Sequence, residues 1–345
     1  MPGSGDNGDR PYRGQAARML RAVRPRIERH ALRTPFRIAR GVRDSIDVAV
    51  VELQHGAVVA RGEGTPTPRY GETPEMVIEQ IEKTADAIAE GADRAALRAL
   101  LPAGAARNAL DNALWDLEAR LAGTLYAPPV EGLVSARTIS IDTPAAMAKA
   151  ALALADARLI KVKLDGNDPA ARLRAVRDSA PAAILIVDAN EGWSLDLLRD
   201  MEEVLVDCAV RLVEQPLPAG QDAALADIAL RVPLCADESC HVAADVSRLR
   251  EIYDFVNIKL DKTGGLTEAL ELLAAARNSG MGVMVGCMLG TSLGMAPAMR
   301  VAAMADYADL DGPWWLREDR SGGLTFAADG SVGPPDDALW AYPAA

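Results

Sequence analysis

Hydrophobic and polar positions follow two different patterns along the chain, and the first covers its N-terminal third. Residues 47–54 and 57–63 are rich in apolar and β-branched side chains, and His55-Gly56 between them is typical of a tight turn. These segments predict an antiparallel hairpin. Apolar positions at helical spacing predict helices over 75–100 and 105–121.

The second pattern begins near residue 134, where short apolar segments alternate with Ala- and Leu-rich helical stretches. The strand-like segments end near Ser140, Lys163, Asp188, Glu214, Asp237, Lys259, Gly286 and Asp309. Successive ends are 22 to 27 residues apart, which is the length of one strand plus one helix. Eight such units predict a parallel sheet that closes into a barrel. The alternative is an open doubly wound sheet, but no glycine-rich phosphate-binding pattern follows an early strand.

Composition and charge narrow the classes of function. Of 345 residues, 50% are hydrophobic and 25% charged, which rules out a disordered chain or a coiled coil. The net charge of −12 argues against binding to nucleic acid or to an anionic membrane. No apolar run reaches the ~18 residues of a membrane span. The polar N-terminus lacks the apolar region of a signal peptide, and we expect a disordered tail over 1–18 in a cytoplasmic protein.

Cysteine and histidine offer little chemistry in this sequence. The four cysteines form no CxxC pair, which favours reduced, buried thiols over a zinc site. The three histidines share no short ligand spacing. Any acid–base chemistry is therefore expected to use Lys, Asp or Glu.

Carboxylates end three successive strand–helix units. Asp188, Glu214 and Asp237 close units three, four and five, so three adjacent strands bring them to the mouth of the predicted barrel. Three oxygen donors without His or Cys suit Mg²⁺, which prefers oxygen ligands in an octahedral arrangement. The structural alternative is that each one caps a helix or forms a salt bridge.

Lysines flank these carboxylates in the predicted ring. Lys161 and Lys163 lie two apart on one strand and point to the same face, while Lys259 ends unit six. Units two and six are diametrically opposite among eight. We predict that burial and nearby cations lower the lysine pKa values, so that these lysines act as general bases near neutral pH. Alternatively, they only neutralise the acidic mouth.

Two opposed bases over a metal predict inversion of a stereocentre. A carboxylate bound to Mg²⁺ has a more acidic α-proton, and the metal stabilises the resulting enediolate. One lysine removes the proton and the opposite lysine returns it on the other face. Racemisation or epimerisation follows, whereas a single base with a leaving group would give elimination.

A further pair of carboxylates, Asp309 and Asp311, ends unit eight. They share a face, and paired carboxylates at a pocket rim require a cation. This cation is either a substrate ammonium or a nearby arginine such as Arg317.

The residues as an ordered set resemble the enolase superfamily, its muconate-lactonizing subgroup, and within it the dipeptide epimerases, most closely the L-Ala-D/L-Glu epimerases. The segments that carry this resemblance are TPFRIARG (34–41), GEGTPTPRYGE (62–72), LPAGAARNALDNALWDLEAR (101–120), KVKLD (161–165), VDANEGW (187–193), EQPLP (214–218), CADESCH (235–241), NIKLDKTGGLTEAL (257–270), GCMLGTS (286–292) and ADLDGP (308–313).

The resemblance implies an α/β fold: a modified (β/α)7β barrel of the TIM type with an α+β capping domain. In this variant the eighth strand lacks a regular outer helix. Residues 19–128 would form the capping domain, with a C-terminal return over 318–345, and residues 129–317 the barrel. The boundary follows the Pro-Pro pair at 128–129.

The resemblance also implies roles for individual residues. Lys163 and Lys259 match the paired acid/base lysines, Lys161 matches an auxiliary lysine, and the three carboxylates match ligands of one Mg²⁺ per subunit. Asp309 and Asp311 match the pair that binds the free ammonium of a dipeptide.

Three further residues concern the substrate. Arg40 matches an arginine expected to hold the glutamate side-chain carboxylate, and Thr138 is placed to hydrogen-bond substrate. Gly290 lacks a side chain where relatives can carry one, which predicts a wider pocket.

The function that the resemblance implies is an Mg²⁺-dependent epimerase that inverts the α-carbon of the C-terminal residue of a dipeptide such as L-Ala-L/D-Glu, in cytoplasmic recycling of cell-wall peptides. A homo-oligomer is compatible with it. The alternative is an N-acylamino-acid racemase or a muconate-type cycloisomerase, although Asp309 and Asp311 argue against a substrate without an ammonium. A non-enzymatic binding protein conflicts with the full set of polar residues.

Overall fold

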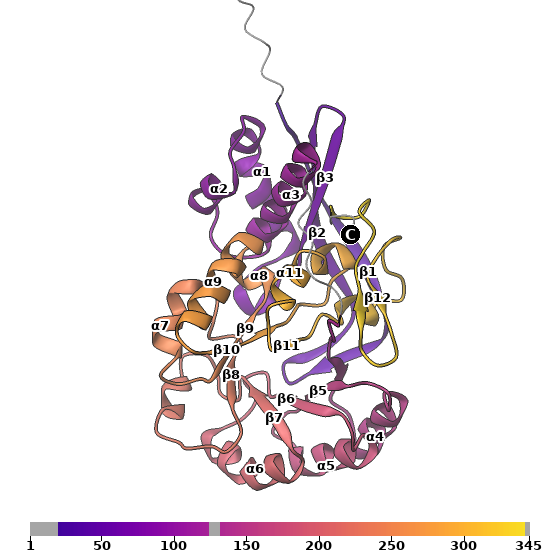
Figure 1. The fold of residues 1–345 in the computed structure, drawn as a ribbon, viewed down its shortest axis with the longest axis vertical. Coiled ribbons are helices and arrows are strands. Elements are labelled where there is room, and N and C mark those ends of the chain that lie inside the picture. The colour runs from indigo at the N-terminus through magenta and orange to yellow at the C-terminus, as the bar shows by residue number, and fades with distance from the viewer. Residues whose placement is uncertain (1–19, 124–131, 342–345) are drawn as a thin grey trace, which may run out of the picture.

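The structure, a computed structural model, describes residues 20–123 and 132–341. Figure 1 shows a cap in indigo and purple at one end and a barrel in magenta to orange at the other. The predicted tail over 1–18 and the predicted domain boundary at 128–129 lie outside the described residues. The C-terminal segment runs back beside the cap sheet, where the Arg317 backbone N–H donates to the Ala31 carbonyl.

The cap combines a three-stranded antiparallel sheet with helices. Its elements are β1 (Ala22–Ile38), β2 (Gly41–His55), β3 (Val58–Gly64), η1 (Pro68–Tyr70), α1 (Pro74–Ala89), α2 (Arg94–Leu100) and α3 (Ala105–Ala122). Strands β2 and β3 form the predicted hairpin. Strand β1 is absent from the prediction because most of its side chains are at least partly exposed and many are charged, which weakens its hydrophobic signal.

The helix predicted over 75–100 is in fact two helices. Gly91 follows α1 with a φ of 106°, a conformation that favours glycine. Asp93 then caps α2 by accepting a hydrogen bond from the Ala96 backbone N–H. A turn and a helix cap therefore interrupt this segment, although the spacing of its apolar residues alone predicts one continuous helix.

Helix α3 joins the cap to the barrel. A Cβ on Gly62 would lie 2.0 Å from the Ala109 carbonyl oxygen, so β3 packs backbone to backbone on α3. On its other side, Arg107 of α3 donates to the carbonyls of Gly264 at 3.2 Å and Thr263, and Asn108 donates to Asp261 at 2.7 Å. These buried contacts fix the cap helix to α8 (Leu260–Thr263), which follows β9, and to Gly264 after it.

The barrel alternates strands and helices as predicted. Its elements are β4 (Arg137–Ile139), α4 (Pro144–Ala153), β5 (Leu159–Lys163), α5 (Pro169–Ser179), β6 (Ile184–Asp188), α6 (Leu195–Asp207), β7 (Val210–Glu214), η2 (Asp222–Leu225), β8 (Leu234–Ala236), η3 (Ala243–Asp245), α7 (Val246–Leu249), β9 (Phe255–Ile258), α8 (Leu260–Thr263), α9 (Leu266–Asn278), β10 (Gly282–Val285), α10 (Ser292–Met295), α11 (Ala298–Ala302) and β11 (Tyr307–Ala308). After β11 come η4 (Gly312–Trp315), β12 (Thr325–Phe326) and β13 (Val332–Gly333). No helix within the two described ranges is long and apolar enough to span a bilayer.

The eight parallel strands follow one another in sequence order from β4 to β11. A parallel bridge between Ser135 and Ala308 joins the two ends of this sheet. Within the described residues, β11 is followed by the short turn η4 in place of a regular outer helix. The predicted (β/α)7β barrel with an α+β cap is therefore confirmed.

Side chains inside the barrel lie in layers. A small apolar cluster fills the lower part, and its buried members come from successive strands: Ala136, Leu159, Ile186, Leu212, Cys235 and Met284. Because strand side chains alternate, positions two residues later on the same face form the next layer toward the carboxyl ends. That layer carries lysines and carboxylates, so the sequence places charged side chains directly above an apolar layer.

Candidate active site

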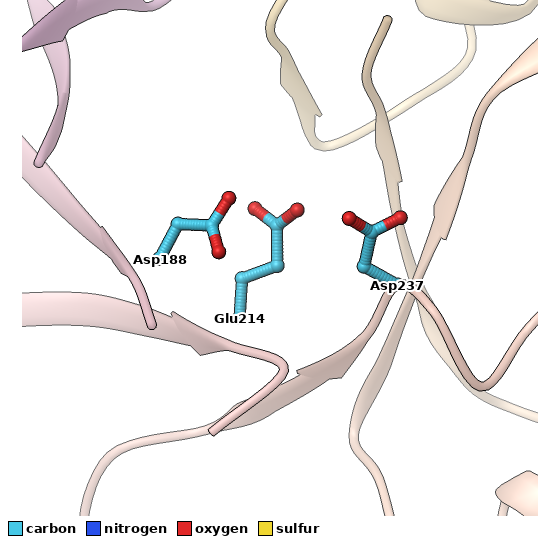
Figure 2. A group of neighbouring side chains, drawn as sticks. All are labelled: Asp188, Glu214 and Asp237. Carbon is cyan, nitrogen blue, oxygen red and sulfur yellow. The ribbon is translucent and has the colours of Figure 1, made fainter. Parts of the chain in front are cut away.

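Three carboxylates meet in this charged layer, as Figure 2 shows. Asp188 and Glu214 are the last residues of β6 and β7, and Asp237 follows β8. All three residues are 0% exposed. One oxygen from each lies within 4.8 Å of the others. Such a set of oxygen donors fits a hard divalent cation such as Mg²⁺.

The electrostatics of the cluster also fit a cation. Burial raises the pKa of Glu214 to about 8, and repulsion from Asp188 acts in the same direction. Burial also opposes ionisation of Asp188 and Asp237, but neighbouring lysines hold their pKa values below the usual range. A divalent ion would supply the positive charge that keeps all three ionised together.

Lys161 and Lys163 point into the cluster from β5. The Lys161 ammonium contacts Glu214 at 2.7 Å, Asp309 at 2.9 Å and Asp188 at 3.0 Å. Lys163 donates to Asp188 at 2.6 Å. The two lysines therefore share a face as predicted, with Lys161 bridging the carboxylates and Lys163 facing the cavity.

Lys259 reaches the same carboxylates from β9, four strands away from β5 in the ring of eight. Its ammonium donates to Asp237 at 2.6 Å, whereas Lys163 donates to Asp188. Both lysines line one cavity of about 440 Å³. The predicted placement of two ammonium groups on opposite strands of the ring, with the carboxylates on the strands between them, agrees with this geometry.

The prediction of lowered lysine pKa values is wrong for two of the lysines in this structure. Burial alone would lower the pKa of Lys161, but attraction by Asp188, Asp309 and Glu214 outweighs it, and the pKa is raised. The pKa of Lys259 is likewise raised, because Asp237 and Glu214 outweigh burial. For Lys161 and Lys259, direct ion pairs with carboxylates therefore affect the pKa more strongly than burial does.

Two supporting residues are absent from the prediction. Lys262 is buried and contacts the Asp237 carboxylate at 2.7 Å, while also donating to the Asn257 carbonyl at 2.9 Å. The Asn257 amide donates to Glu214 at 2.8 Å. Partners of this kind orient the side chains that hold a metal. Asn257 lies on β9 two residues before Lys259, which directly follows that strand, so its inward direction could be predicted from the alternation of side chains.

Asp309 and Asp311 follow β11 and line the cavity with Thr138. Asp311 accepts from the Thr138 backbone N–H at 2.7 Å, and the Thr138 hydroxyl is 3.4 Å from Asp309. Burial and repulsion from Asp309 raise the pKa of Asp311 to about 7. Among the described residues, Asp309 pairs with Lys161, and neither carboxylate pairs with Arg317.

Arginines from the cap form the rim of the cavity: Arg40 lies in the turn between β1 and β2, and Arg43 lies near the start of β2. Arg40 contacts Glu238 at 2.7 Å and Glu191 at 3.0 Å, so protein carboxylates already occupy its guanidinium. Arg43 also lines the cavity, and no ion pair or side-chain hydrogen bond engages it within the described chain. Although Arg43 is exposed, partial desolvation by its neighbours and the nearby Arg40 charge lower its pKa. A positive side chain without a protein partner is a better receptor for an anion than one already paired.

The expectation that Gly290 widens the pocket is wrong. A Cβ at this position would lie 3.1 Å from the Met295 methyl group, 3.2 Å from Glu63 and 3.3 Å from the Thr65 hydroxyl. The missing side chain therefore faces the cap contact, and the neighbouring Met288 and Leu289 line the cavity instead.

Comparison with known families agrees with this geometry. Residues 145–338 match the family model described as enolase C-terminal domain-like, and residues 21–128 match the mandelate racemase / muconate lactonizing enzyme N-terminal domain. The chain belongs to the enolase superfamily. The predicted family is thereby confirmed, since the two matches cover most of the cap and most of the barrel.

Similar superfamily members are named epimerases and racemases. The L-Ala-D/L-Glu epimerase of Escherichia coli K12 is 46% identical over 89% of this chain and 98% of its own length. The N-acetyl-D-glutamate racemase of a Pseudoalteromonas species is 45% identical over 81% of this chain and 90% of its own. These relatives are isomerases, as predicted for this chain.

Solved superfamily structures superpose closely on the chain. An enolase family member from Agrobacterium tumefaciens, solved with bound sodium and L-Ala-L-Glu, has a TM-score of 0.90 and 48% identity and covers 93% of this chain and 99% of its own. The dipeptide epimerase of Enterococcus faecalis, solved with Mg and L-Leu-L-Tyr, has a TM-score of 0.85 and 28% identity, with 92% and 98% covered. Metal and dipeptide therefore occur together in similar enzymes.

Proposed function

We propose that this enolase-superfamily protein is a metal-dependent dipeptide epimerase that inverts the α-carbon of a C-terminal acidic residue, as in L-Ala-L/D-Glu. The observation that carries the proposal is the pair Lys163 and Lys259 on opposite strands of one cavity, with three buried carboxylates on the strands between them. The names of the similar enzymes support the same reaction.

Asp188, Glu214 and Asp237 would hold one Mg²⁺ per subunit. When bound, the ion supplies positive charge that makes the α-proton of the substrate carboxylate more acidic. The donor set supports this proposal because it consists of oxygen alone and because Glu214 resists ionisation without an added cation.

The proton transfer uses the two lysines. A cation held by Asp188 and Asp237 would compete with the lysines for these carboxylates and weaken the ion pairs that keep the lysines protonated. The neutral amine of one lysine then takes the α-proton and becomes an ammonium, while the opposite ammonium donates a proton to the other face of the carbon and becomes an amine. The two lysines thus exchange protonation states with each turnover. Lys161 stays paired with Asp188, Glu214 and Asp309 and keeps the cluster neutralised.

Recognition of a dipeptide divides between the two edges of the cavity. Asp309 and Asp311 are proposed to receive the free ammonium, with Thr138 orienting both carboxylates. For the acidic side chain we propose Arg43 in place of the predicted Arg40, because Arg40 is already paired with Glu191 and Glu238. A place in cytoplasmic recycling of cell-wall peptides remains a prediction from the sequence.

The test is incubation with Mg²⁺ and L-Ala-L-Glu in deuterated water. We expect inversion of the second residue with deuterium at its α-carbon, detected by mass shift and chiral chromatography. Unchanged stereochemistry and no deuterium uptake across a panel of acidic dipeptides would overturn the proposal.

A second measurement separates the dipeptide reaction from racemisation of an N-acylated amino acid. Asp311→Asn should reduce kcat/KM for L-Ala-L-Glu far more than for N-acetylglutamate, because only the dipeptide offers an ammonium for a charge-assisted hydrogen bond. Equal losses on both substrates, or a wild-type preference for N-acetylglutamate, would favour the racemase.

A further inference from the structure

The Glu191 carboxylate joins three segments at the rim of the cavity. Arg69 donates to both of its oxygens at 2.7 Å, and Arg40 donates to one of them at 3.0 Å. The Ala219 backbone N–H donates to the other at 2.8 Å. Arg40 lies in the turn between β1 and β2, and Arg69 lies in η1 within the connection from β3 to α1, so the two come from separate cap loops. Glu191 and Ala219 belong to the barrel loops after β6 and β7.

The backbone that presents Glu191 is unusual. Asn190 and Glu191 adopt φ values of 45° and 66°, in the left-handed region that costs roughly 1 kcal/mol or more for a residue with a side chain. The Asn190 N–H donates to the metal-ligand candidate Asp188 at 2.9 Å, and the Glu191 N–H donates to the Gln215 carbonyl at 2.9 Å. This conformation lifts the Glu191 side chain out of the barrel loop toward the cap.

A second contact holds one of these loops. Arg40 also pairs with Glu238 at 2.7 Å and donates to the Asn190 carbonyl at 3.0 Å. A Cβ on Gly192 would lie 3.1 Å from the Ala39 Cβ, so the cap loop rests directly on the loop after β6. Arg40 and Arg69 thus reach the barrel next to the residues that follow Asp188 and Asp237.

These contacts differ from an ordinary surface ion pair, which contributes little to stability. The Glu191 side chain is only 9% exposed, and it is shared by two guanidinium groups. Burial opposes its ionisation, yet the hydrogen bonds from Arg69 and the charge of Arg40 hold the pKa of Glu191 below its usual range. The carboxylate is therefore a largely shielded anion, and both of its charged partners come from the cap.

We propose that Glu191 is a positioning residue that, through Arg40 and Arg69, latches both cap loops over the cavity before substrate arrives. The reaction that it serves is that of the proposed function. A protein whose loops are already closed loses less free energy on ordering them around a substrate, so the latch raises apparent affinity. It also occupies Arg40 and leaves Arg43 as the rim arginine open to a substrate anion.

The test removes one charge and keeps the shape. Glu191→Gln retains an oxygen that can accept from Ala219 and Arg69 but loses the negative charge. The matched control is Asp47→Asn, because Arg29 donates to both oxygens of Asp47 at 2.7 Å on the cap sheet, away from the cavity. Thermal unfolding establishes that both variants fold.

Limited trypsin digestion without substrate measures the latch directly. Mass spectrometry follows cleavage after Arg40 and Arg43, which both variants retain. We expect Glu191→Gln to be cleaved there at least about fivefold faster than wild type, and Asp47→Asn at the wild-type rate. Equal rates in Glu191→Gln and wild type, or equal acceleration in both variants, would overturn the proposal.

Kinetics then separate positioning from general loosening. With L-Ala-L-Glu we expect Glu191→Gln to raise KM about tenfold and to leave kcat within about threefold, because the closed state still forms once substrate binds. Faster cleavage with an unchanged KM would overturn the positioning role. If wild type epimerises no dipeptide, the proposed function fails, whereas selective cleavage of Glu191→Gln would still support the latch.

Discussion

The floor and the rim of the cavity are built in different ways. The floor consists of charged side chains at strand ends, such as Lys161 and Asp188, which are 1% and 0% exposed and held by several ion pairs each. The rim consists of arginines on cap loops, and the Arg40 and Arg69 side chains are 34% and 36% exposed. The proposed reaction therefore uses side chains on rigid strands, whereas the proposed choice of substrate depends on loops, whose sequence can vary more freely.

The largest effect should come from the floor. Lys163→Ala and Lys259→Ala are each expected to reduce epimerisation by at least about 10³-fold, because each removes one of the two proton carriers. Deuterium incorporation and inversion are measured separately for both substrate isomers. Lys149→Ala, on the exposed face of α4, serves as control and should keep wild-type rates. If either cavity variant kept most of its activity, the two-base reaction would be wrong.

A second change to the floor tests the metal. Glu214→Gln should weaken Mg²⁺ binding at least about 100-fold, since even partners that only orient a ligand change affinity 10- to 100-fold. Calorimetric titration gives the affinity, and the Mg²⁺-dependent rise in Tm should shrink accordingly. Glu203→Gln, whose side chain is 77% exposed, is the control. Equal affinities for the two variants would remove Glu214 from the proposed metal site.

Changes at the rim should be smaller and should depend on the substrate. Arg43→Met is expected to raise KM for L-Ala-L-Glu about 10- to 100-fold through loss of a charge-assisted hydrogen bond, while L-Ala-L-Ala changes less than about threefold. Arg211→Met, on the outer side of β7, should change neither. A similar loss on both dipeptides would show that Arg43 shapes the cavity without reading the acidic side chain.

The smallest effect concerns the free energy of unfolding and its dependence on the buried carboxyl group of Asp261 in α8. Burial raises the pKa of Asp261 to about 7 even though Thr65 and Asn108 donate hydrogen bonds to it, and the nearby Glu63 and Glu72 charges act in the same direction as burial. The folded protein then holds the Asp261 proton more tightly than the unfolded chain does. The stabilisation of the folded state by this bound proton is therefore lost as pH rises from about 4 through about 7.

Asp261→Asn mimics the protonated form and should gain stability relative to wild type as pH rises. Denaturant unfolding at pH 5 and pH 8 is expected to show a relative gain of about 1 kcal/mol or more at the higher pH. The exposed Asp156→Asn should show no such change between the two pH values. A pH-independent difference for Asp261→Asn would mean that Asp261 is already ionised at pH 5.

The floor could be predicted from the sequence because it follows a simple spacing rule. Strand ends 22 to 27 residues apart and side chains alternating along each strand were enough to bring Lys163, Asp188 and Lys259 together. The strength of the ion pairs could not be predicted from this spacing. Lys161 and Lys259 have raised pKa values because particular carboxylates lie within 3.0 Å, and those distances exist only in the folded barrel.

Which of the two neighbouring rim arginines pairs with protein carboxylates could not be predicted, for the same physical reason. Arg40 and Arg43 are three residues apart on one cap segment, and nothing local distinguishes them. The difference arises from Glu191 and Glu238, which are about 150 and 200 residues further along the chain and meet Arg40 only across the cap–barrel contact. Long-range pairing of this kind leaves no periodic signal in a single sequence.

The grip of α3 on α8 limits how the enzyme can admit its substrate. Helix α8 begins immediately after Lys259, and Arg107 and Asn108 of the cap hold the residues that follow. Swinging the cap away as one body would pull on the strand that carries this lysine and disturb the proton relay. Entry and release must therefore depend on movement of short loops at the entrance of the cavity. Changes in the sequence of those loops can then alter the range of substrates while the reacting groups keep their alignment.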